Sequence, residues 1–221
     1  MAEAETKKGK CHLYAYHMTR LDNVASIFED GRILSSGTMR NADAKFGDIG
    51  SGSITERRFK NKLKCHRGSV YVNDCVPFYF RPMSAMLSHL HFIKSNKNNF
   101  DPNFGQNQIA YLICDLEDTM IWAEKASNLW AFTDGNAGSK HWNFNSYSSR
   151  DEVKDLDWDT ILTANSADPR TQAEFLVQDF VDVSCIQEVV VRTEGSKKSL
   201  LRQITDIEIT PNIFVEPNLY Y

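Results

Sequence analysis

The sequence predicts a single domain of the α+β class, and three observations lead to that prediction. Segments with the period of a strand outnumber those with the period of a helix, and the helical ones are short. Strands and helices do not follow one another in regular βαβ order, and no segment repeats. The 221 residues, 42% of them hydrophobic, suffice for one sizeable core. We therefore expect residues 11–221 to form one domain.

The amino-terminal part is expected to begin with a strand and a helix. HLYAYHM (12–18) alternates as a strand does, and residues 22–31 carry apolar side chains at helical spacing before a terminating Gly31. Residues 35–53 are rich in Gly, Ser and Asn, which predicts a loop. A helix is expected over residues 54–64.

The middle of the chain is expected to contain a buried strand and a long loop. VPFYF (76–80) is dense in residues that favour strands, and Pro82 ends it. Residues 84–93 can form a helix. Residues 94–108 are too polar and too rich in turn-forming residues to pack, so they predict a second surface loop.

The remaining elements are mostly short strands. Apolar, strand-favouring runs predict four of them, at residues 109–116, 129–133, 173–177 and 188–193. Helices are expected around residues 153–162 and 196–204, followed by short strands near Ile207 and Ile213.

Composition limits the environment and the ligands. Residues 1–10, MAEAETKKGK, lack the continuous apolar stretch of a secretory signal, so we expect a flexible tail and a cytoplasmic protein. No apolar run is long enough to cross a membrane. The five cysteines have no CxxC spacing, and the six histidines form no metal-binding pair. We therefore expect neither a disulfide framework nor a metal. We also expect a monomer.

Polar side chains lie within otherwise apolar strands at three places. They are His17 and Thr19 in YHMT, the stretch from Asp74 to Tyr79, and Glu174 in QAEFLV. Burying such a group costs on the order of a few kcal/mol unless it is paired, so each needs a partner or a function. For any one of them, a hydrogen-bonded core residue is the commoner explanation. Three in one small domain favour a functional site.

A basic segment interrupts an acidic chain. The net charge is -4, yet RRFKNKLKCHR (57–67) carries three Arg, three Lys and one His and no acid. A solvated helix face is the usual explanation of such a run, whereas beside a reactive site it would attract a nucleic acid. The candidate contacts in it are Arg58, Lys60, Lys62 and Lys64. Candidate stacking surfaces for bases are Phe78, Tyr79, Phe80 and Trp142, although aromatic residues at strand spacing are more often core.

Together these residue types suit an enzyme that breaks the glycosidic bond to nicotinamide. His and Thr on one strand can hold ribose hydroxyls and an amide, an Arg can hold a diphosphate, and one Glu can stabilise positive charge at the anomeric carbon. One carboxylate is enough, because the leaving group is already cationic and needs no general acid. The chain contains neither GxGxxG after a strand nor GxxxxGK[ST], which are the common glycine-rich loops that bind nucleotide phosphates. A nucleotide would therefore bind through other residues.

Seven segments in order resemble the DarT family of DNA ADP-ribosyltransferase toxins. They are YHMTRLDNVASIFEDGRILS, ITERRFK, VNDCVPFYFRPMSAML, AFTDGNA, DLDWDTI, QAEFLV and the closing LYY. The resemblance runs from about His12 to Tyr221 and leaves out the tail and the loop after Ile93. VPFYFxPxSxML followed by QAEFLV is its most specific part.

The resemblance implies the ADP-ribosyltransferase fold, a split antiparallel sheet with short helices around an NAD+ cleft. It implies that Glu174 and Arg57 are catalytic and that His17, Thr19, Asn23 and Arg57 bind NAD+ as the co-substrate, with no metal. Members of the family are toxins that transfer ADP-ribose to a base of single-stranded DNA, commonly thymine and in one branch guanine. Many are neutralised by DarG, a macrodomain antitoxin, which is therefore the expected partner.

The chain departs from the family pattern where the acceptor is expected. VNDC (72–75) replaces LHDY, and FTDGNA places Asn136 where many relatives have His. Together with Tyr79, Asn136 is thus a candidate contact to the nucleic acid, and the target base stays open. RNA is an alternative acceptor. Protein is a weaker one, because QAE carries a single carboxylate where arginine-modifying relatives have ExE, and a non-catalytic binding module is the alternative from another class.

Overall fold

The computed structural model describes residues 13–42, 56–65, 67–88, 105–140, 144–207 and 211–221. The expected tail at residues 1–10, most of the two expected loops, and Trp142 lie outside the described residues.

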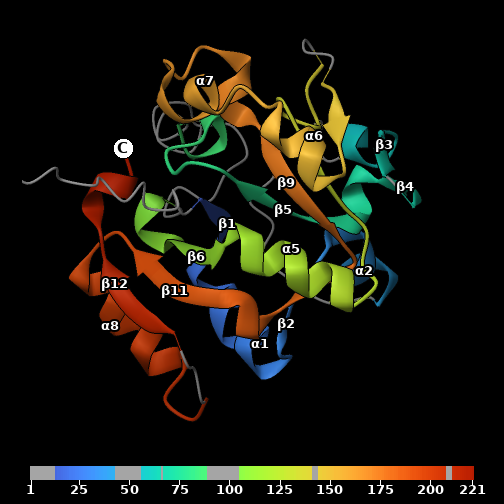
Figure 1. Ribbon diagram of the computed structural model, residues 1–221. Coiled ribbons are helices and arrows are strands. Elements are labelled where there is room, and N and C mark those ends of the chain that lie inside the picture. Colours follow the sequence, from blue (N-terminus) through green and yellow to red (C-terminus); the bar gives the residue numbers. More distant parts are fainter. Residues whose placement is uncertain (1–12, 43–55, 66, 89–104, 141–143, 208–210) are drawn as a thin grey trace, which may run out of the picture.

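An eight-stranded sheet forms the centre of the described structure (Figure 1). From one edge to the other its strands are β12 (Asn212–Val215), β11 (Ile186–Val191), β6 (Ile109–Asp115), β1 (Tyr14–Arg20), β5 (Cys75–Tyr79), β9 (Glu174–Gln178), β7 (Trp130–Thr133) and β8 (Ser146–Tyr147). Neighbouring strands are antiparallel except β11 and β12, which run parallel. The α+β class predicted from the sequence is confirmed.

The sheet is split between β1 and β5. These two strands share a single register pair, in which Tyr16 lies opposite Tyr79. By contrast, β1 pairs with β6 along its whole length, and β5 pairs with β9 from Cys75 to Tyr79. Two half-sheets therefore meet at one point, and the backbone beyond that point is free to make other contacts.

Helices cover one face of the sheet. There α1 (Val24–Glu29), α5 (Leu116–Lys125), α7 (Trp158–Thr163) and α8 (Glu194–Gln203) pack with the strands into one large apolar cluster. Figure 1 shows α5 lying across the strands on this side. The cluster spans both half-sheets, since it includes Ala15 of β1 and Phe175 of β9.

The other face carries two separate apolar clusters. The tyrosine cluster lies on the β1 half-sheet and consists of Met18, Leu87, Ile109, Tyr111, Ile113, Val190 and Tyr220. The hairpin cluster lies on the β9 half-sheet and consists of Leu63, Cys65, Val70, Val72, Cys75, Ala131, Ala137 and Leu176. Tyr79 and Glu174 share this face and belong to neither cluster.

The helix expected over residues 54–64 is wrong for most of its length. Among the described residues only 56–58 are helical, and the chain then forms a hairpin of β3 (Lys62–Cys65) and β4 (Gly68–Tyr71). Exposed lysines alternate there with buried Leu63 and Cys65, which enter the hairpin cluster. The run Lys-Leu-Lys-Cys thus has the period of two that a half-buried strand requires.

Other elements differ from the sequence prediction in detail. The helix expected at residues 153–162 is two short helices, α6 (Arg150–Lys154) and α7. α5 was not predicted, although Asp115 caps it and apolar residues recur along it. The expected loop at residues 35–53 begins with α2 (Ser36–Asn41), and β2 (Arg32–Leu34) pairs with β10 (Phe180–Asp182). Ile207 lies in a bend rather than a strand, whereas Ile213 lies in β12.

Candidate active site

Glu174 is the first residue of β9 and is fully buried although it is a carboxylate. The strand register places it directly opposite Tyr79 of β5, so both side chains lie on the same face. Its backbone N–H donates to the hydroxyl of Thr133 in β7 at 3.2 Å. The central strands therefore fix where this carboxylate lies.

Arg58 holds the Glu174 carboxylate through two parallel hydrogen bonds. Its Nη1 donates to Oε1 at 3.0 Å and its Nη2 donates to Oε2 at 2.8 Å. The Arg58 side chain is 15% exposed and that of Glu174 is 0% exposed. Burial alone would lower the pKa of Arg58, but the Glu174 carboxylate offsets this and the pKa is raised. The two groups thus form a bidentate ion pair that is largely shielded from water.

A third donor reaches Glu174 from the segment 134–139, which follows β7. The backbone N–H of Ala137 donates to Oε1 at 3.2 Å. Two side chains hold this segment in place: Arg57 donates from Nε to the Gly138 carbonyl at 2.7 Å, and Asn61 donates from Nδ2 to the Ala137 carbonyl at 2.7 Å. Arg57 and Asn61 therefore position the backbone donor, while Arg58 contacts the carboxylate itself.

Arg57 and Arg58 lie in different places in the site. The sequence resemblance implies that Arg57 is the second catalytic residue, and the basic segment suggests Arg58 as a nucleic-acid contact. In the structure, Arg58 is the one that contacts Glu174. Successive residues of a helical turn point about 100° apart, so only one of two adjacent arginines can face the same carboxylate. Arg57 lies against the backbone of Gly138 instead. No signal in the sequence separates the two arginines, and none indicates Asn61.

His17 lies in β1 where the two half-sheets diverge. Its Nδ1 is 2.9 Å from the carbonyl oxygen of Pro77, and its ring centroid is 5.5 Å from that of Phe78. Burial lowers the pKa of His17 from 6.5 to about 4, while the Pro77 carbonyl opposes part of this shift. The imidazole is therefore neutral near pH 7, with Nδ1 as the donor and Nε2 as an acceptor.

The other two residues expected to bind NAD+ follow His17 along the chain. Thr19 is buried, and its hydroxyl accepts a hydrogen bond from Asn23 Nδ2 at 3.3 Å. Thr19 lies on the same face of β1 as His17, two residues away, and Asn23 ends the turn that follows the strand. The structure thus groups His17, Thr19 and Asn23 at one end of β1.

Tyr79 and Asn136, the expected acceptor contacts outside the basic segment, both lie near Glu174. Tyr79 is buried opposite it, and burial together with the Glu174 charge raises the pKa of the Tyr79 hydroxyl. Asn136 precedes Ala137 and is partly exposed; its Nδ2 is 3.4 Å from Gln172 Oε1, and its Oδ1 accepts the Gly138 N–H at 2.8 Å. Of the two, Asn136 is the one that can reach a ligand without rearrangement of the core.

The three candidate lysines lie on the surface beyond Arg58. Lys60, Lys62 and Lys64 are all exposed, and none forms an ion pair with another described residue. The basic segment thus has Arg58 at the buried Glu174 carboxylate and three exposed lysines on the surface that follows it along the chain.

Sequence comparison identifies the family of this chain. A family model described as "ssDNA thymidine ADP-ribosyltransferase, DarT" matches residues 16–221. The chain belongs to the DarT family. A DarT relative from Thermus sp. (strain 2.9), named DNA ADP-ribosyl transferase, is 29% identical over 213 residues, covering 93% of this chain and 95% of the relative. Another relative, from Escherichia coli O127:H6, is 24% identical, and the match covers 93% of this chain and 92% of the relative.

Solved DarT structures have the same fold. Thermus sp. 2.9 DarT in complex with ADP-ribosylated ssDNA is similar with a TM-score of 0.79 and 25% identity, over 95% of this chain and 96% of that one. The complex of the same protein with NAD+ gives a TM-score of 0.74 at 23% identity, over 96% and 99% of the two chains. The ADP-ribosyltransferase fold predicted from the sequence resemblance is confirmed, as is membership of the DarT family.

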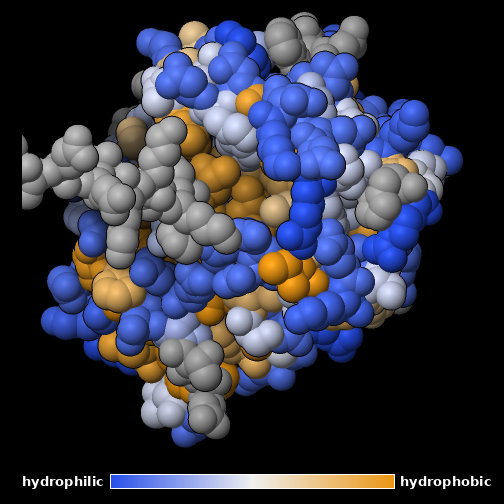
Figure 2. Space-filling view, in the orientation of Figure 1, coloured by the Kyte–Doolittle hydropathy of each residue, from blue (hydrophilic) through white to orange (hydrophobic). Residues whose placement is uncertain are grey.

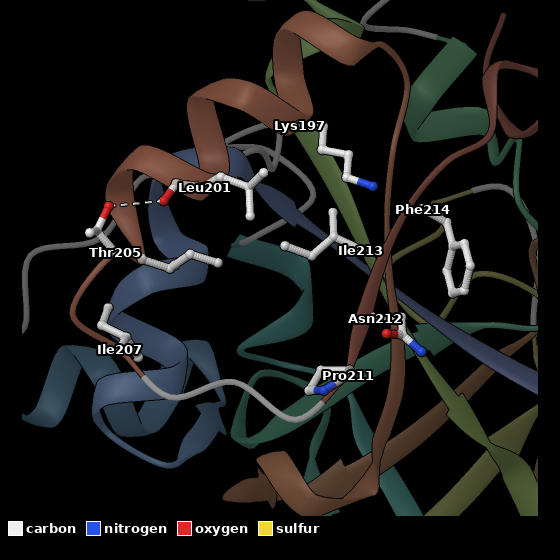
Figure 3. A pocket seen from close by; sticks show the side chains of 9 residues that line it. Lys197, Leu201, Thr205, Ile207, Pro211, Asn212, Ile213 and Phe214 are labelled. Carbon is white, nitrogen blue, oxygen red and sulfur yellow. Dashed lines mark hydrogen bonds between the residues drawn. The ribbon is translucent and has the colours of Figure 1, made fainter.

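A groove in the described part of this DarT protein lies away from Glu174. It has a volume of about 930 Å³ and runs between α8 and β12 (Figure 3), with Leu201 and Ile213 on its walls. Figure 2 shows apolar residues among hydrophilic ones over this end of the molecule. Four strands separate β12 from β9, a span of about 24 Å at the usual spacing. The groove is therefore distinct from the candidate active site at Glu174.

The described residues lack two kinds of feature. They contain no group of three or more His, Cys, Asp or Glu side chains that could hold a metal ion. They also contain no helix that is both long and apolar enough to span a membrane.

The low pKa of His17 should make the stability of this DarT protein fall at acid pH. Unfolded chains take up a proton at His17 near pH 6.5, whereas the folded protein takes it up only near pH 4. Lowering the pH through this window therefore favours the unfolded state, and the loss ends below about pH 4. We expect Tm to fall less between pH 7 and pH 4 in His17→Asn than in the wild type. Equal losses of Tm in the two proteins would contradict a neutral, buried His17.

Proposed function

We propose that this protein transfers ADP-ribose from NAD+ to a base of single-stranded DNA and releases nicotinamide. The observation that carries the proposal is the Glu174 carboxylate, buried in a strand of a DarT fold and held by Arg58 and the Ala137 N–H. A carboxylate fixed in this way is preorganised, because it needs no rearrangement when positive charge develops nearby. DarT membership supplies the substrates, since the family is described as acting on thymidine in ssDNA.

In the proposed reaction the bond between nicotinamide and the ribose anomeric carbon breaks and a base nitrogen forms the new bond. Glu174 stabilises the positive charge at the anomeric carbon and accepts the proton that the base nitrogen loses. The His17, Thr19 and Asn23 group on β1 holds the NAD+ side of the site. Arg58 keeps both carboxylate oxygens in place, and Arg57 with Asn61 keeps the Ala137 N–H aimed at one of them.

Thymine is the first candidate for the acceptor base, because the matching family model is described by it. Guanine is the second, since the chain carries VNDC and Asn136 where many relatives have histidines. Of the two positions, Asn136 adjoins the donor to Glu174, whereas Asn73 is buried in the turn that precedes β5.

The direct test is transfer from labelled NAD+ to oligonucleotides that differ in a single base. Each DNA oligonucleotide would be matched by an RNA of the same sequence, and the adduct would be mapped by mass spectrometry. We expect ADP-ribose on thymine in single-stranded DNA and none on duplex, because a paired base must first be unstacked at a cost of about a few kcal/mol. Product on RNA alone, or on protein alone, would overturn the proposed acceptor.

The exposed lysines should supply the electrostatic part of DNA binding. Replacing Lys60, Lys62 and Lys64 together with Ala should weaken binding and reduce the slope of log affinity against log salt by about 2, given about 0.7 per phosphate contact on single strands. The matched control removes three cations of α8, Lys197, Lys198 and Arg202, which lie at the other end of the sheet. An unchanged salt slope in the first variant would place the DNA on another surface.

We also propose that the protein is a cytoplasmic toxin neutralised by a macrodomain antitoxin of the DarG type. A structure of Thermosipho africanus DarTG in complex with ADP-ribose matches 95% of this chain, with a TM-score of 0.70 and 19% identity, and this chain covers 51% of it. That chain is thus about twice as long as the part it shares. Growth arrest on expression of the wild type, relieved by a DarG macrodomain, is the expected result.

A further inference from the structure

The β3–β4 hairpin has one buried and one exposed face. Leu63, Cys65 and Val70 enter the hairpin cluster, which also contains Ala137, the backbone donor to Glu174. The opposite face presents Lys62, Lys64, Ser69 and Tyr71, all of them exposed. We call these four residues the outer hairpin face. Its position is fixed relative to Glu174, because the buried side of the same hairpin packs into the site.

The outer hairpin face combines positive charge with an exposed aromatic ring. Lys62 lies directly opposite Tyr71, and its ammonium is 4.8 Å from the ring centroid. Tyr71 is 41% exposed, so much of its ring is open to solvent. A similar pair adjoins the hairpin, where the Arg40 guanidinium lies 4.4 Å from the centre of the 37% exposed Phe59 ring. Single exposed aromatic side chains are common, but here each is accompanied by a cation.

The chain links this face closely to the reactive carboxylate. Arg58, at Glu174, is four residues before Lys62, and the Val72 N–H donates to the Asn61 carbonyl at 3.0 Å, which extends the hairpin ladder toward Arg58. Four residues span at most about 14 Å. A stacked nucleic-acid strand has a phosphate about every 3.4 Å, so this distance corresponds to roughly four nucleotides. A strand with its target base at Glu174 can therefore extend over Tyr71.

We propose that the outer hairpin face is a second contact for the DNA strand, in which Tyr71 stacks on a base within about four nucleotides of the modified one. The inference rests on the proposed transfer to single-stranded DNA. Lys62 and Lys64 contact the phosphates on either side of that base. At the end of β3 the Ser146 hydroxyl of β8 donates to the Lys64 carbonyl at 3.2 Å, which holds this part of the hairpin against the sheet. Every base has a face that can stack on an aromatic ring, so Tyr71 does not select a particular base. It raises the affinity for DNA strands that are long enough to reach it.

The test compares two single-stranded DNA substrates with the same target base. One has about five nucleotides with the target base at its centre, so that it ends before the hairpin, and the other has about twenty and covers the hairpin. For the wild type, kcat/KM should be higher on the long strand. Tyr71→Ala should lower kcat/KM on the long strand roughly 5- to 100-fold and lower it much less on the short one. Tyr71→Phe, which keeps the ring, should recover most of the loss.

Phe214→Ala is the matched control, because Phe214 is a comparably exposed aromatic residue on β12, far from β9. Its long-strand kcat/KM should equal that of the wild type, and thermal unfolding should confirm that all variants are folded. An undiminished long-strand advantage in Tyr71→Ala overturns the inference, as does an equal loss on both strands, which would mean that Tyr71 only supports the site. Failure of the wild type to modify either strand would instead refute the proposed function.

Discussion

Replacing Glu174 with Gln should lower the rate of ADP-ribose transfer by about 10²- to 10³-fold or more. Gln has the same shape and can still accept a hydrogen bond from Arg58, but it carries no negative charge and cannot take the proton from the acceptor base. Both contributions of the carboxylate are lost in one step. The measurement is single-turnover transfer to the best DNA substrate, with NAD+ affinity determined separately.

Glu174→Ala should also lose transfer, but it is the less informative variant. Removing the side chain leaves the Arg58 guanidinium, 15% exposed, without its partner, and breaking such a pair costs about 3 kcal/mol. Lost activity could then reflect a less stable protein. Thermal unfolding of both variants separates the two effects. Transfer by Glu174→Gln within tenfold of the wild type would remove Glu174 from the mechanism.

Arg58→Lys should reduce transfer by about 10²-fold, because a single ammonium cannot hold both carboxylate oxygens. Arg57→Lys should reduce it by about tenfold or less, since Arg57 acts only through the Gly138 carbonyl and the segment that follows β7. Asn61→Ala, at the other anchor of that segment, should behave like Arg57→Lys. The paired comparison uses adjacent residues of one type, so each variant controls for the other.

A larger loss of transfer in Arg57→Lys than in Arg58→Lys would support the catalytic role that the sequence resemblance implies for Arg57. If Arg57→Lys abolished transfer and Arg58→Lys left it near the wild-type level, the Arg58–Glu174 pair would be a structural contact that opens during catalysis. Splitting the effect between kcat and KM for NAD+ sharpens the comparison, because a group that binds diphosphate changes mainly KM, whereas one that positions Glu174 changes kcat.

The sequence predicted the parts of this site that depend on residue type within a pattern. Glu174 stands out as a carboxylate in an apolar strand, and His17 with Thr19 stands out for the same reason. It could not show that Tyr79 lies opposite Glu174, because that depends on the register of strands far apart in the chain. It could not choose between Arg57 and Arg58, because the choice depends on the orientation of one helical turn.

The errors in the fold have similar causes. The lysines between residues 60 and 64 favoured a helix by composition, but the cluster under the hairpin decided the outcome, since it buries Leu63 and Cys65 on one side. α5 was missed because its apolar residues directly continue those of β6, and the boundary between them is a single capping residue, Asp115. Ala137 contributes a backbone N–H, which no side-chain pattern indicates.

The split between the half-sheets has a consequence for how the family can diversify. The residues expected to hold NAD+ lie on the β1 half, whereas Glu174, the hairpin cluster and Asn136 lie on the β9 half. Only the Tyr16–Tyr79 pair joins the two halves along the backbone. The two halves share the apolar cluster on the helix-covered face, so they are separate only on the face that carries Glu174. Substitutions around Asn136 can therefore alter contacts beside Glu174 without replacing a residue of the His17, Thr19 and Asn23 group.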